Sequence, residues 1–552
     1  MTSVGVRPTG RQHRRVHWAT VAVAALPVAA LLLFFVYPVA GMLARGLWPD
    51  GSFDLAGVVD VLTRPRTRRV LWFTVWSAGL ATLVSVGAGL PVAFVLHRLR
   101  FPGRDVLRAL VVVPFVLPTV VVGVAFRQLI APSGPLGFLA LDGTATAIVA
   151  ALVFFNISVV VRTVGAFWEA IDARREEAAA VLGASPLQVF RTVTLPALLP
   201  GIVSAASVVF LFCATSFGVV LTMGGLRYAN VETEIYLLTT QELDLTAAAA
   251  LSIVQLLVIV ALLVLSARVR RTPGAVDRTT RVLSRPRRRH LPALAWTAAV
   301  LVFLMAPIVS LVAASLRRGD DWGLENYRAL GTTGSRNALL VPATEGLLNS
   351  FEVAIVASAI ALTLGASVAY LVSRPEGGRA GSILDGVFML PLGVSAVTVG
   401  FGFLITLDRP PVDLRSSSLL IPVAQAMVAL PLVVRTVAPV LRSVDDRQRQ
   451  AAASLGAGPL RVLMTVDVPV AWRPLLAAAG FAFAVSLGEF GATSFLARDD
   501  SPTLPVVIYR LIGRPGAENF GMAMAASVVL AASTAVVMFA VQRLRVASVG
   551  SF

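Results

Sequence analysis

The chain is a series of apolar blocks separated by short polar segments. The blocks are about 20 residues long, the length at which an α-helix crosses the hydrocarbon core of a membrane. They predict twelve spans, six on either side of a polar stretch at residues 267–291. The spans lie near residues 18–43, 70–96, 107–129, 145–161, 200–222 and 245–266, and then near 292–315, 348–372, 383–406, 417–434, 474–497 and 520–541.

The second half of the chain repeats the first. The pentapeptide VVRTV at residues 160–164 recurs at residues 433–437, an offset of 273 positions. The same offset relates Asp172 to Asp445, Gly183 to Gly456, Pro196 to Pro469, Phe217 to Phe490 and Tyr236 to Tyr509. Because each half holds an even number of spans, both share one orientation. We expect a pseudo-two-fold axis along the membrane normal, with a translocation path between the halves.

The composition excludes an ordinary soluble protein. Hydrophobic residues make up 57% of the 552 residues and charged residues only 14%, against about 25% charged in a typical globular protein. All 47 basic residues are arginine, and a chain without lysine has neither a Walker-type phosphate loop nor a Schiff-base lysine. The single cysteine, Cys213, permits no intrachain disulfide or thiolate cluster. We therefore expect no catalytic residue, metal site or cofactor in this chain.

The net charge of +17 agrees with a membrane topology in which both termini are cytoplasmic. Most arginines then fall on the cytoplasmic side, as the positive-inside rule requires, and anionic lipid rather than nucleic acid is the expected partner. We divide the chain into a first module (1–266), an Arg-rich cytoplasmic linker (267–291) and a second module (292–552). One cluster disagrees, because it lies on the predicted outer side: Arg64, Arg66, Arg68 and Arg69.

The most informative pattern lies between the fourth and fifth spans of each half, at residues 162–199 and 435–473. Its positions are Glu177, Ala178, Ala179, Gly183 and Pro196 in the first copy, and Gln450, Ala451, Ala452, Gly456 and Pro469 in the second. The alanines favour a helix, and a glycine commonly follows the end of a helix. A proline near the start of the next helix completes the pattern. It predicts a short helix-turn-helix at the cytoplasmic face of the membrane.

This spacing resembles the E-A-A-x3-G-x9-I-x-L-P loop of binding-protein-dependent ABC importer permeases, in both copies. The resemblance implies an all-α protein of the bacterial inner membrane, built from two tandem six-helix permease modules of the MetI-like type. It implies partners too: two copies of an ABC ATPase subunit that binds ATP and Mg, and an extracytoplasmic substrate-binding protein. Ala178, Ala179, Ala451 and Ala452 would allow close approach to the ATPase, and Glu177 would make a polar contact. Because Gln450 replaces the glutamate, we expect the two ATPase contacts to be unequal.

Candidates for the substrate path lie in the fifth and eleventh spans: Ser216, Glu489 and Thr493. Glu489 is the carboxylate that we place inside the hydrocarbon, where a charged group costs at least about 2.5 kcal/mol. It either attracts a cationic substrate or caps a neighbouring helix near the outer face. The segment at 486–509 resembles thiamine permeases, so thiamine is the expected cargo and ferric iron the alternative. A bare ferric ion would need more oxygen ligands than one carboxylate.

Two further questions stay open at this point. The predicted outer loop with Glu232, Glu234, Glu242 and Asp244 either faces a binding protein or is merely solvated. A function of another class is an ion-driven transporter of six plus six spans. That class would need several ionisable residues within the membrane, and it would leave the duplicated loop without an explanation.

Overall fold

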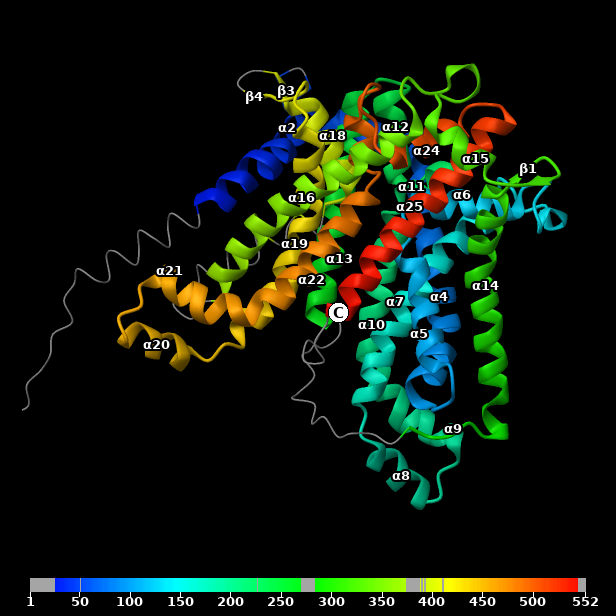
Figure 1. The fold of residues 1–552 in the computed structure, drawn as a ribbon, viewed down its shortest axis with the longest axis vertical. Coiled ribbons are helices and arrows are strands. Elements are labelled where there is room, and N and C mark those ends of the chain that lie inside the picture. Colours follow the sequence, from blue (N-terminus) through cyan, green and yellow to red (C-terminus); the bar gives the residue numbers. More distant parts are fainter. Residues whose placement is uncertain are drawn as a thin grey trace, which may run out of the picture.

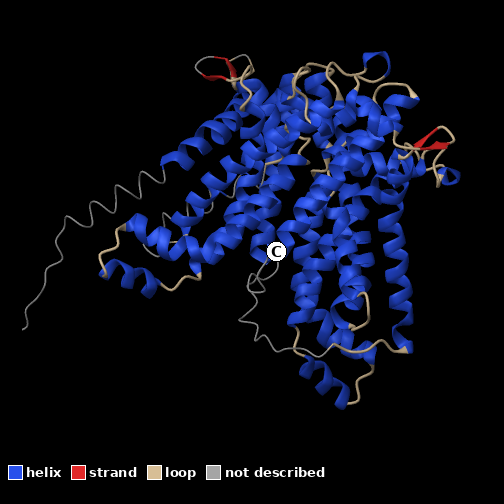
Figure 2. Ribbon diagram, in the orientation of Figure 1, coloured by secondary structure: helices blue, strands red, loops and turns tan. Residues whose placement is uncertain are grey.

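The structure is a computed structural model that describes residues 25–49, 51–225, 227–269, 283–373, 388, 391, 394–409 and 412–544. These residues are helical or in loops, apart from two small antiparallel hairpins (Figure 2). The hairpins are β1 (Arg317–Arg318) with β2 (Asp321–Trp322), and β3 (Asp408–Arg409) with β4 (Val412–Asp413). Ten of the described helices are long and apolar enough to cross a membrane, or eleven when one bent pair is counted as a span.

The first half is a helical bundle around α4, α7 and α10 (Figure 1). These helices pack side by side and bury Ala81, Val160 and Val209 between them. The elements of this half are η1 (Leu32–Val36), α2 (Tyr37–Leu47), α3 (Leu55–Thr63), α4 (Pro65–Arg98), α5 (Arg104–Val116), α6 (Thr119–Ile130), η2 (Gly137–Leu139), α7 (Ala145–Ala170), α8 (Ala173–Val181), α9 (Pro186–Val189), η3 (Phe190–Thr194), α10 (Leu195–Ala214), α11 (Phe217–Gly224), α12 (Val231–Thr240) and α13 (Leu245–Val269).

The second half repeats this bundle with α16, α19 and α22, which bury Ala361, Val433 and Ala478. Its elements are η4 (Arg288–His290), α14 (Leu291–Ser315), α15 (Glu325–Arg328), η5 (Ala329–Gly331), η6 (Ser335–Asn337), α16 (Ala343–Val372), α18 (Ala396–Thr406), α19 (Leu420–Arg442), α20 (Asp446–Ser454), α21 (Pro459–Val462), η9 (Leu463–Asp467), α22 (Val468–Leu487), α23 (Thr493–Leu496), α24 (Leu504–Ile512) and α25 (Ala517–Leu544). The predicted all-α architecture of two repeated halves is confirmed.

The first long helix of each half packs against the other half. Helix α2 lies along α18, and its buried Met42 joins a core cluster made mostly of second-half residues. Helix α14 lies along α4 and α6, and its buried Leu304 joins the core of the first half. Next to it, Phe303 contacts Phe126 and Phe154, with ring centroids 6.2 and 6.3 Å apart. Each half therefore completes the apolar core of the other.

One predicted span is bent. The block at residues 107–129 forms two helices, α5 and α6, with an angle of 103° between them. Leu117 at the junction is extended, with φ −69° and ψ 135°. The next residue, Pro118, disfavours helical backbone at the residue before it, so α5 ends there. The corresponding block of the second half, predicted at 383–406, lies partly outside the described residues, and its end is α18.

Two other predicted spans are shifted along the chain. The spans expected at 200–222 and 474–497 belong to helices that run over Pro186–Ala214 and Pro459–Leu487. Each helix has 29 residues, which at a rise of 1.5 Å per residue is about 43 Å, long enough to cross a bilayer with its interfaces. The apolar residues beyond these ends belong to the short helices α11 and α23.

The two halves meet at one end of the molecule and diverge towards the other. In Figure 1, α8 lies at the bottom and α20 at the lower left, well apart, whereas α11, α12 and α24 gather at the top. We call the end with α11, α12 and α24 the closed end, and the end with α8 and α20 the loop end.

Candidate coupling loops and translocation path

The loop end carries two copies of one backbone motif, the first loop (residues 171–185) and the second loop (residues 443–458). Each contains a nine-residue helix, α8 or α20. Asp172 and Asp445 cap these helices, because each side chain accepts a hydrogen bond of 2.9 Å from the backbone N–H two residues later. The predicted helices are therefore present, within loops that are shorter than the expected 162–199 and 435–473.

Gly183 and Gly456 end the two helices with left-handed backbone, at φ 87° and 85°. The N–H of each glycine donates to the carbonyl three residues earlier, at 3.0 and 2.9 Å. The following N–H donates to the carbonyl five residues earlier, at 3.1 and 3.0 Å. This is a Schellman motif, in which glycine is favoured because it has no Cβ. A Cβ at either position would meet nothing within 4 Å, so the backbone conformation alone selects glycine here.

The helix after each glycine is long, so the predicted short helix-turn-helix is wrong in this respect. It begins at Pro186 or Pro459 and continues through a π-helical turn, η3 or η9, into α10 or α22. Pro196 and Pro469 follow those turns directly. Proline has no N–H and clashes with the carbonyl four residues earlier, so a regular α-helical turn is disfavoured directly before it. Each loop is thus continuous with a spanning helix.

Both loops expose leucines at matching positions. Leu182 and Leu455 are 87% and 89% exposed, and Leu187 and Leu460 are 57% and 68% exposed. Paired apolar side chains in this position mark an interaction surface. The residues predicted for coupling surround them: Glu177, Ala178, Gly183, Gln450, Ala451 and Gly456 are exposed, Ala179 and Ala452 are half-buried, and Pro196 and Pro469 are exposed on the long helices.

A carboxylate holds the first loop in place. Glu176 pairs with the guanidinium of Arg98 at the end of α4. It also accepts a hydrogen bond of 2.8 Å from the hydroxyl of Thr194 in η3. The side chains of Glu176 and Arg98 are only 15% and 11% exposed. The first loop is therefore tied both to α4 and to the helix that follows it.

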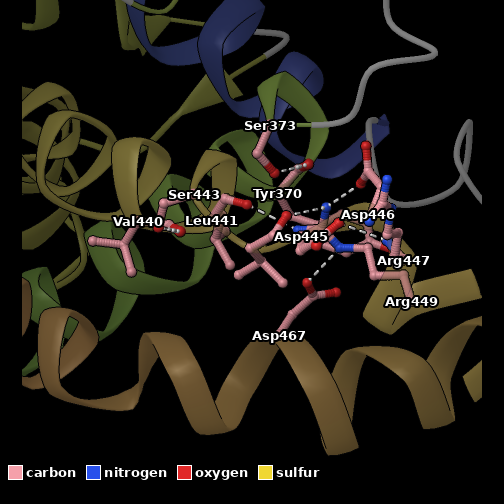
Figure 3. A network of polar contacts seen from close by, with 11 residues as sticks. Tyr370, Ser373, Val440, Leu441, Ser443, Asp445, Asp446, Arg447, Arg449 and Asp467 are labelled. Atoms are coloured by element: carbon pink, nitrogen blue, oxygen red, sulfur yellow. Dashed lines mark hydrogen bonds and ion pairs between the residues drawn. The ribbon is translucent and has the colours of Figure 1, made fainter. Parts of the chain in front are cut away.

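A guanidinium holds the second loop (Figure 3). Arg449 donates hydrogen bonds of 2.8 Å to Asp467, 2.6 Å to Asp446 and 2.8 Å to the carbonyl of Leu441. The side chains of Arg449 and Asp467 are 8% and 1% exposed. Burial alone would lower the pKa of Arg449, but its bonds to the two aspartates outweigh burial and raise that pKa above its ordinary value.

Sequence reasoning missed these anchors, although the repeat carries a signal for them. The offset of 273 aligns Glu176 with Arg449 and Thr194 with Asp467. The positions of an acid and a hydroxyl in the first copy are thus occupied by a base and an acid in the second copy. In both copies the two residues can form a hydrogen bond with each other, although their charges differ, which indicates that they are in contact. The resemblance to the known loop points instead to Glu177 and Gln450, whose side chains are exposed.

At the closed end, Glu489 caps a helix. Its carboxylate accepts hydrogen bonds from the backbone N–H groups of Ala492 and Thr493, at 2.8 and 3.0 Å, and from the Thr493 hydroxyl. Gln425 donates to the same hydroxyl at 3.0 Å. These contacts occupy both oxygens of a buried carboxylate, and they correspond to the capping role rather than to an open substrate site.

The three residues predicted for the path are all buried. Thr493 and Glu489 contact each other within the second half. Ser216 occupies the position that the repeat aligns with Glu489, and its backbone carbonyl accepts a hydrogen bond of 2.8 Å from Asn230. The hydrogen bonds that the structure shows for these residues are thus made to neighbouring groups of the protein.

Aromatic rings from both halves meet next to these residues. Phe217 and Phe490 are stacked, with ring centroids 5.3 Å apart and an interplanar angle of 24°. Tyr236 lies 5.4 Å from the Phe217 ring, and Tyr509 lies 5.5 Å from the Phe490 ring. Because the repeat relates Phe217 to Phe490, a contact between them lies on the pseudo-two-fold axis, as in any isologous interface. The predicted axis therefore passes through this stack.

Comparison with known families identifies the type of protein. Residues 85–272 and 361–547 each match the model of the binding-protein-dependent transport system inner membrane component. The chain belongs to this family. It is therefore an inner membrane permease component with two copies of the family domain, and permeases of this kind are non-catalytic subunits. Each matched segment contains one loop and one of the two stacked phenylalanines, Phe217 or Phe490, which we call the axis phenylalanines. Both segments begin after the helices that pack against the opposite half, α2 and α14.

Relatives of this permease cover most of its length. The thiamine transport system permease protein ThiP of Brucella abortus is 28% identical over 507 residues, which is 88% of this chain and 90% of that protein. ThiP of Escherichia coli is 28% identical over 80% of this chain and 83% of its own length. The sulfate transport system permease protein CysT of Salmonella typhimurium is 36% identical over 35% of this chain and 73% of its own length.

The arginine cluster of this permease has partners within the chain. Arg64 pairs with Asp244 at 3.2 Å, and Arg66 pairs with Glu234 at 2.7 Å and with Glu242. The acidic segment predicted to face solvent or a binding protein is therefore partly neutralised internally. Glu232 in this segment is fully buried and joins the two halves. Its carboxylate accepts hydrogen bonds from Gln255 in α13 and, at 2.9 Å, from Ser395 at the start of α18.

Proposed function

We propose that this permease forms the translocation path of an ATP-driven importer, with both loops and both termini in the cytoplasm of a bacterium. Two copies of a separate ABC ATPase, which hold ATP and Mg, would each seat one loop. The observation that carries this proposal is the pair of exposed leucines, Leu182 and Leu455, at the same place in two identical backbone motifs. A single loop of this kind could be a surface connector, but a matched pair fits two identical partners.

The loops are placed to transmit movement across the membrane. Each continues into a helix of 29 residues that ends beside an axis phenylalanine. When two ATPase subunits close on ATP, the loops would approach each other, and the far ends of these helices would separate. The chain itself would break no bond. Its residues would bind the motor, carry the movement and line the path.

An extracytoplasmic binding protein would deliver the cargo at the closed end. The family description names binding-protein-dependent transport, and in this orientation the closed end is the extracytoplasmic face. The inter-half contacts Phe217–Phe490 and Glu232–Ser395 lie there. Docking of the binding protein would favour the state in which these contacts are open, which couples cargo delivery to the ATP-driven step.

Thiamine is the cargo that we propose. Two relatives that match most of the chain are thiamine permeases, whereas the sulfate permease matches about a third of it. The axis contact consists of two phenyl rings, which suit a flat aromatic cation better than a bare ferric ion, since that ion requires several oxygen ligands. Membership of a binding-protein-dependent family also disfavours the ion-driven alternative.

Transport by the reconstituted complex tests this function. The permease, its ATPase and its binding protein should accumulate labelled thiamine in vesicles only with ATP, and neither labelled sulfate nor ferric ion should be accumulated. A matched complex whose ATPase cannot hydrolyse ATP is the control. Uptake driven by an ion gradient without ATP would contradict the importer assignment, and uptake of ferric ion or sulfate instead of thiamine would contradict the cargo.

A further inference from the structure

The axis of the permease is occupied at the closed end by rings from both halves. Phe217 and Phe490 are 5% and 2% exposed, so their stack leaves almost no surface of either ring uncovered. Tyr236 extends the cluster further, because its ring also contacts Phe495 of the second half, at 5.3 Å. A translocation path on this axis is therefore closed here by side chains and not by backbone.

Each axis phenylalanine lies at a break between helices. Phe217 begins α11 directly after the long helix that ends at Ala214, and Phe490 lies between α22, which ends at Leu487, and α23. The opposite end of each long helix is a loop. A tilt of these helices would move the two phenylalanines relative to each other, because each ring is joined by three residues or fewer to the end of its own helix.

The structure assigns a gate to these rings. We propose that Phe217 and Phe490 close the translocation path at the closed end, and that with Tyr236 and Tyr509 they form a stacking surface for a flat aromatic cation. The second part rests on the proposed cargo; the first does not. An apolar constriction closes a path by excluding water and ions. Once separated, the same rings attract a cation through their faces and stack with an aromatic ring.

Two double variants separate closure from stacking. Phe217→Ala with Phe490→Ala removes both rings and should open a passive path. Phe217→Leu with Phe490→Leu keeps apolar bulk on the axis and removes the aromatic faces. The matched control is Phe126→Leu with Phe154→Leu. These rings are also in contact, at 5.2 Å, and buried, but they contact Phe303 of α14 and belong to a core cluster that contains neither Phe217 nor Phe490.

The measurement uses the permease–ATPase complex in vesicles loaded with labelled thiamine and with choline, a cation without an aromatic ring. Without ATP, the alanine pair should raise the efflux of both cations by about tenfold or more, since the apolar constriction is lost. The leucine pair should keep efflux at the wild-type level but lower ATP-driven thiamine uptake about fivefold, the loss expected for one cation–π contact. The control pair should change neither quantity by that much.

Each result decides one part of the proposal. Wild-type efflux from an alanine pair that still assembles with the ATPase would overturn the gate, as would equal efflux from the control pair. Normal thiamine uptake by the leucine pair would overturn the stacking role. Choline efflux does not depend on the cargo. If the wild type fails to accumulate thiamine, the proposed cargo fails while the choline measurement still tests the gate.

Discussion

The first and second loops share a backbone and differ in the chemistry that holds it. Both have an aspartate cap, a nine-residue helix and a glycine at φ 85–87°. The first is held by Glu176 between Arg98 and Thr194, and the second by Arg449 between Asp467, Asp446 and a carbonyl. The two copies thus share the backbone of the exposed loop. In the buried contact behind it, the loop helix contributes an acid in the first copy and a base in the second.

The two anchors also differ in where they attach. Glu176 reaches Arg98 in α4, so the first loop is fixed to a neighbouring spanning helix. Arg449 reaches the end of α19 through the carbonyl of Leu441 and the start of the next long helix through Asp467. The partner contacts were expected to differ at Glu177 and Gln450, but the larger difference lies on the buried side of the loops. Variants of the anchors, the glycines and the helix starts test the comparison.

The largest effect is expected at Arg449. The variant Arg449→Leu removes the cation that pairs with the buried Asp467, and removing one member of a buried pair costs about 3–5 kcal/mol. Hydrogen exchange of α20 in the purified complex should rise accordingly. The double variant Arg449→Leu with Asp467→Leu should recover most of the protection, because no buried charge is left. A single variant as protected as the wild type would contradict the role of this anchor.

The pH dependence of this anchor follows from the pKa of Arg449. Because the folded-state pKa of Arg449 lies above its ordinary value, the stabilisation is complete below the ordinary pKa and is lost only as the pH rises through the raised pKa. The difference in exchange between Arg449→Leu and wild type should therefore stay constant at neutral and mildly alkaline pH. A difference that disappears within that range would show that another group carries the effect.

A smaller effect is expected at the first anchor. Glu176→Gln keeps the shape and one hydrogen-bond acceptor for Thr194 but removes the counter-charge of Arg98, whose side chain is 11% exposed, at a cost of about 1–3 kcal/mol. Exchange should increase in α8 and at the end of α4, and α20 should stay unchanged. The neighbouring Glu177→Gln is the matched control, since that side chain is exposed. If Glu176→Gln and Glu177→Gln had equal effects on exchange, Glu176 would not be the residue that anchors the first loop.

The glycines should behave alike, because the two backbones do. Gly183→Ala and Gly456→Ala each force a Cβ into left-handed backbone, at a cost of about 1 kcal/mol. Neither Cβ meets another atom within 4 Å, so thermal unfolding should shift by the same amount in both variants. A clearly larger shift in one would mean that the loops differ in backbone and not only in their anchors.

The smallest effect concerns the start of the second helix. The Ser185 hydroxyl accepts a hydrogen bond from the N–H of Gln188, and the Gln188 side-chain oxygen accepts one from the N–H of Ser185, whereas Gly458 offers no side chain at this position. Gly458→Ser should therefore stabilise the second loop by a few tenths of a kcal/mol, and Ser185→Gly should destabilise the first by about as much. Amide exchange in the first turn after each site would measure both changes. Changes of the same sign would contradict the capping argument.

The sequence predicts this molecule well where a local pattern determines the structure. Span length, the repeat and the helix-ending glycines all follow from the order of residues along the chain. The bend before Pro118 was missed because the residues on both sides are apolar, so hydropathy continues across it. The continuation past Pro196 was missed because proline usually interrupts a helix, and the π turn that accommodates it leaves no pattern.

Contacts between distant segments were harder to predict. The periodicity of α2 and α14 does not show that each of these helices packs against the opposite half. Glu489 was placed correctly only as one of two alternatives, since capping and substrate binding require the same carboxylate. Arg449 and Asp467 could have been paired from the exchange of charge at aligned positions, which the repeat makes visible in a single sequence.

Native mass spectrometry of the permease with its ATPase subunit tests most directly that each loop seats one motor subunit. Wild type should carry two ATPase copies. Leu182→Arg or Leu455→Arg alone should leave one, and the two together should leave none, while the control Leu340→Arg, at an exposed leucine outside the long helices, should retain both. Two copies retained on the double variant would contradict the account.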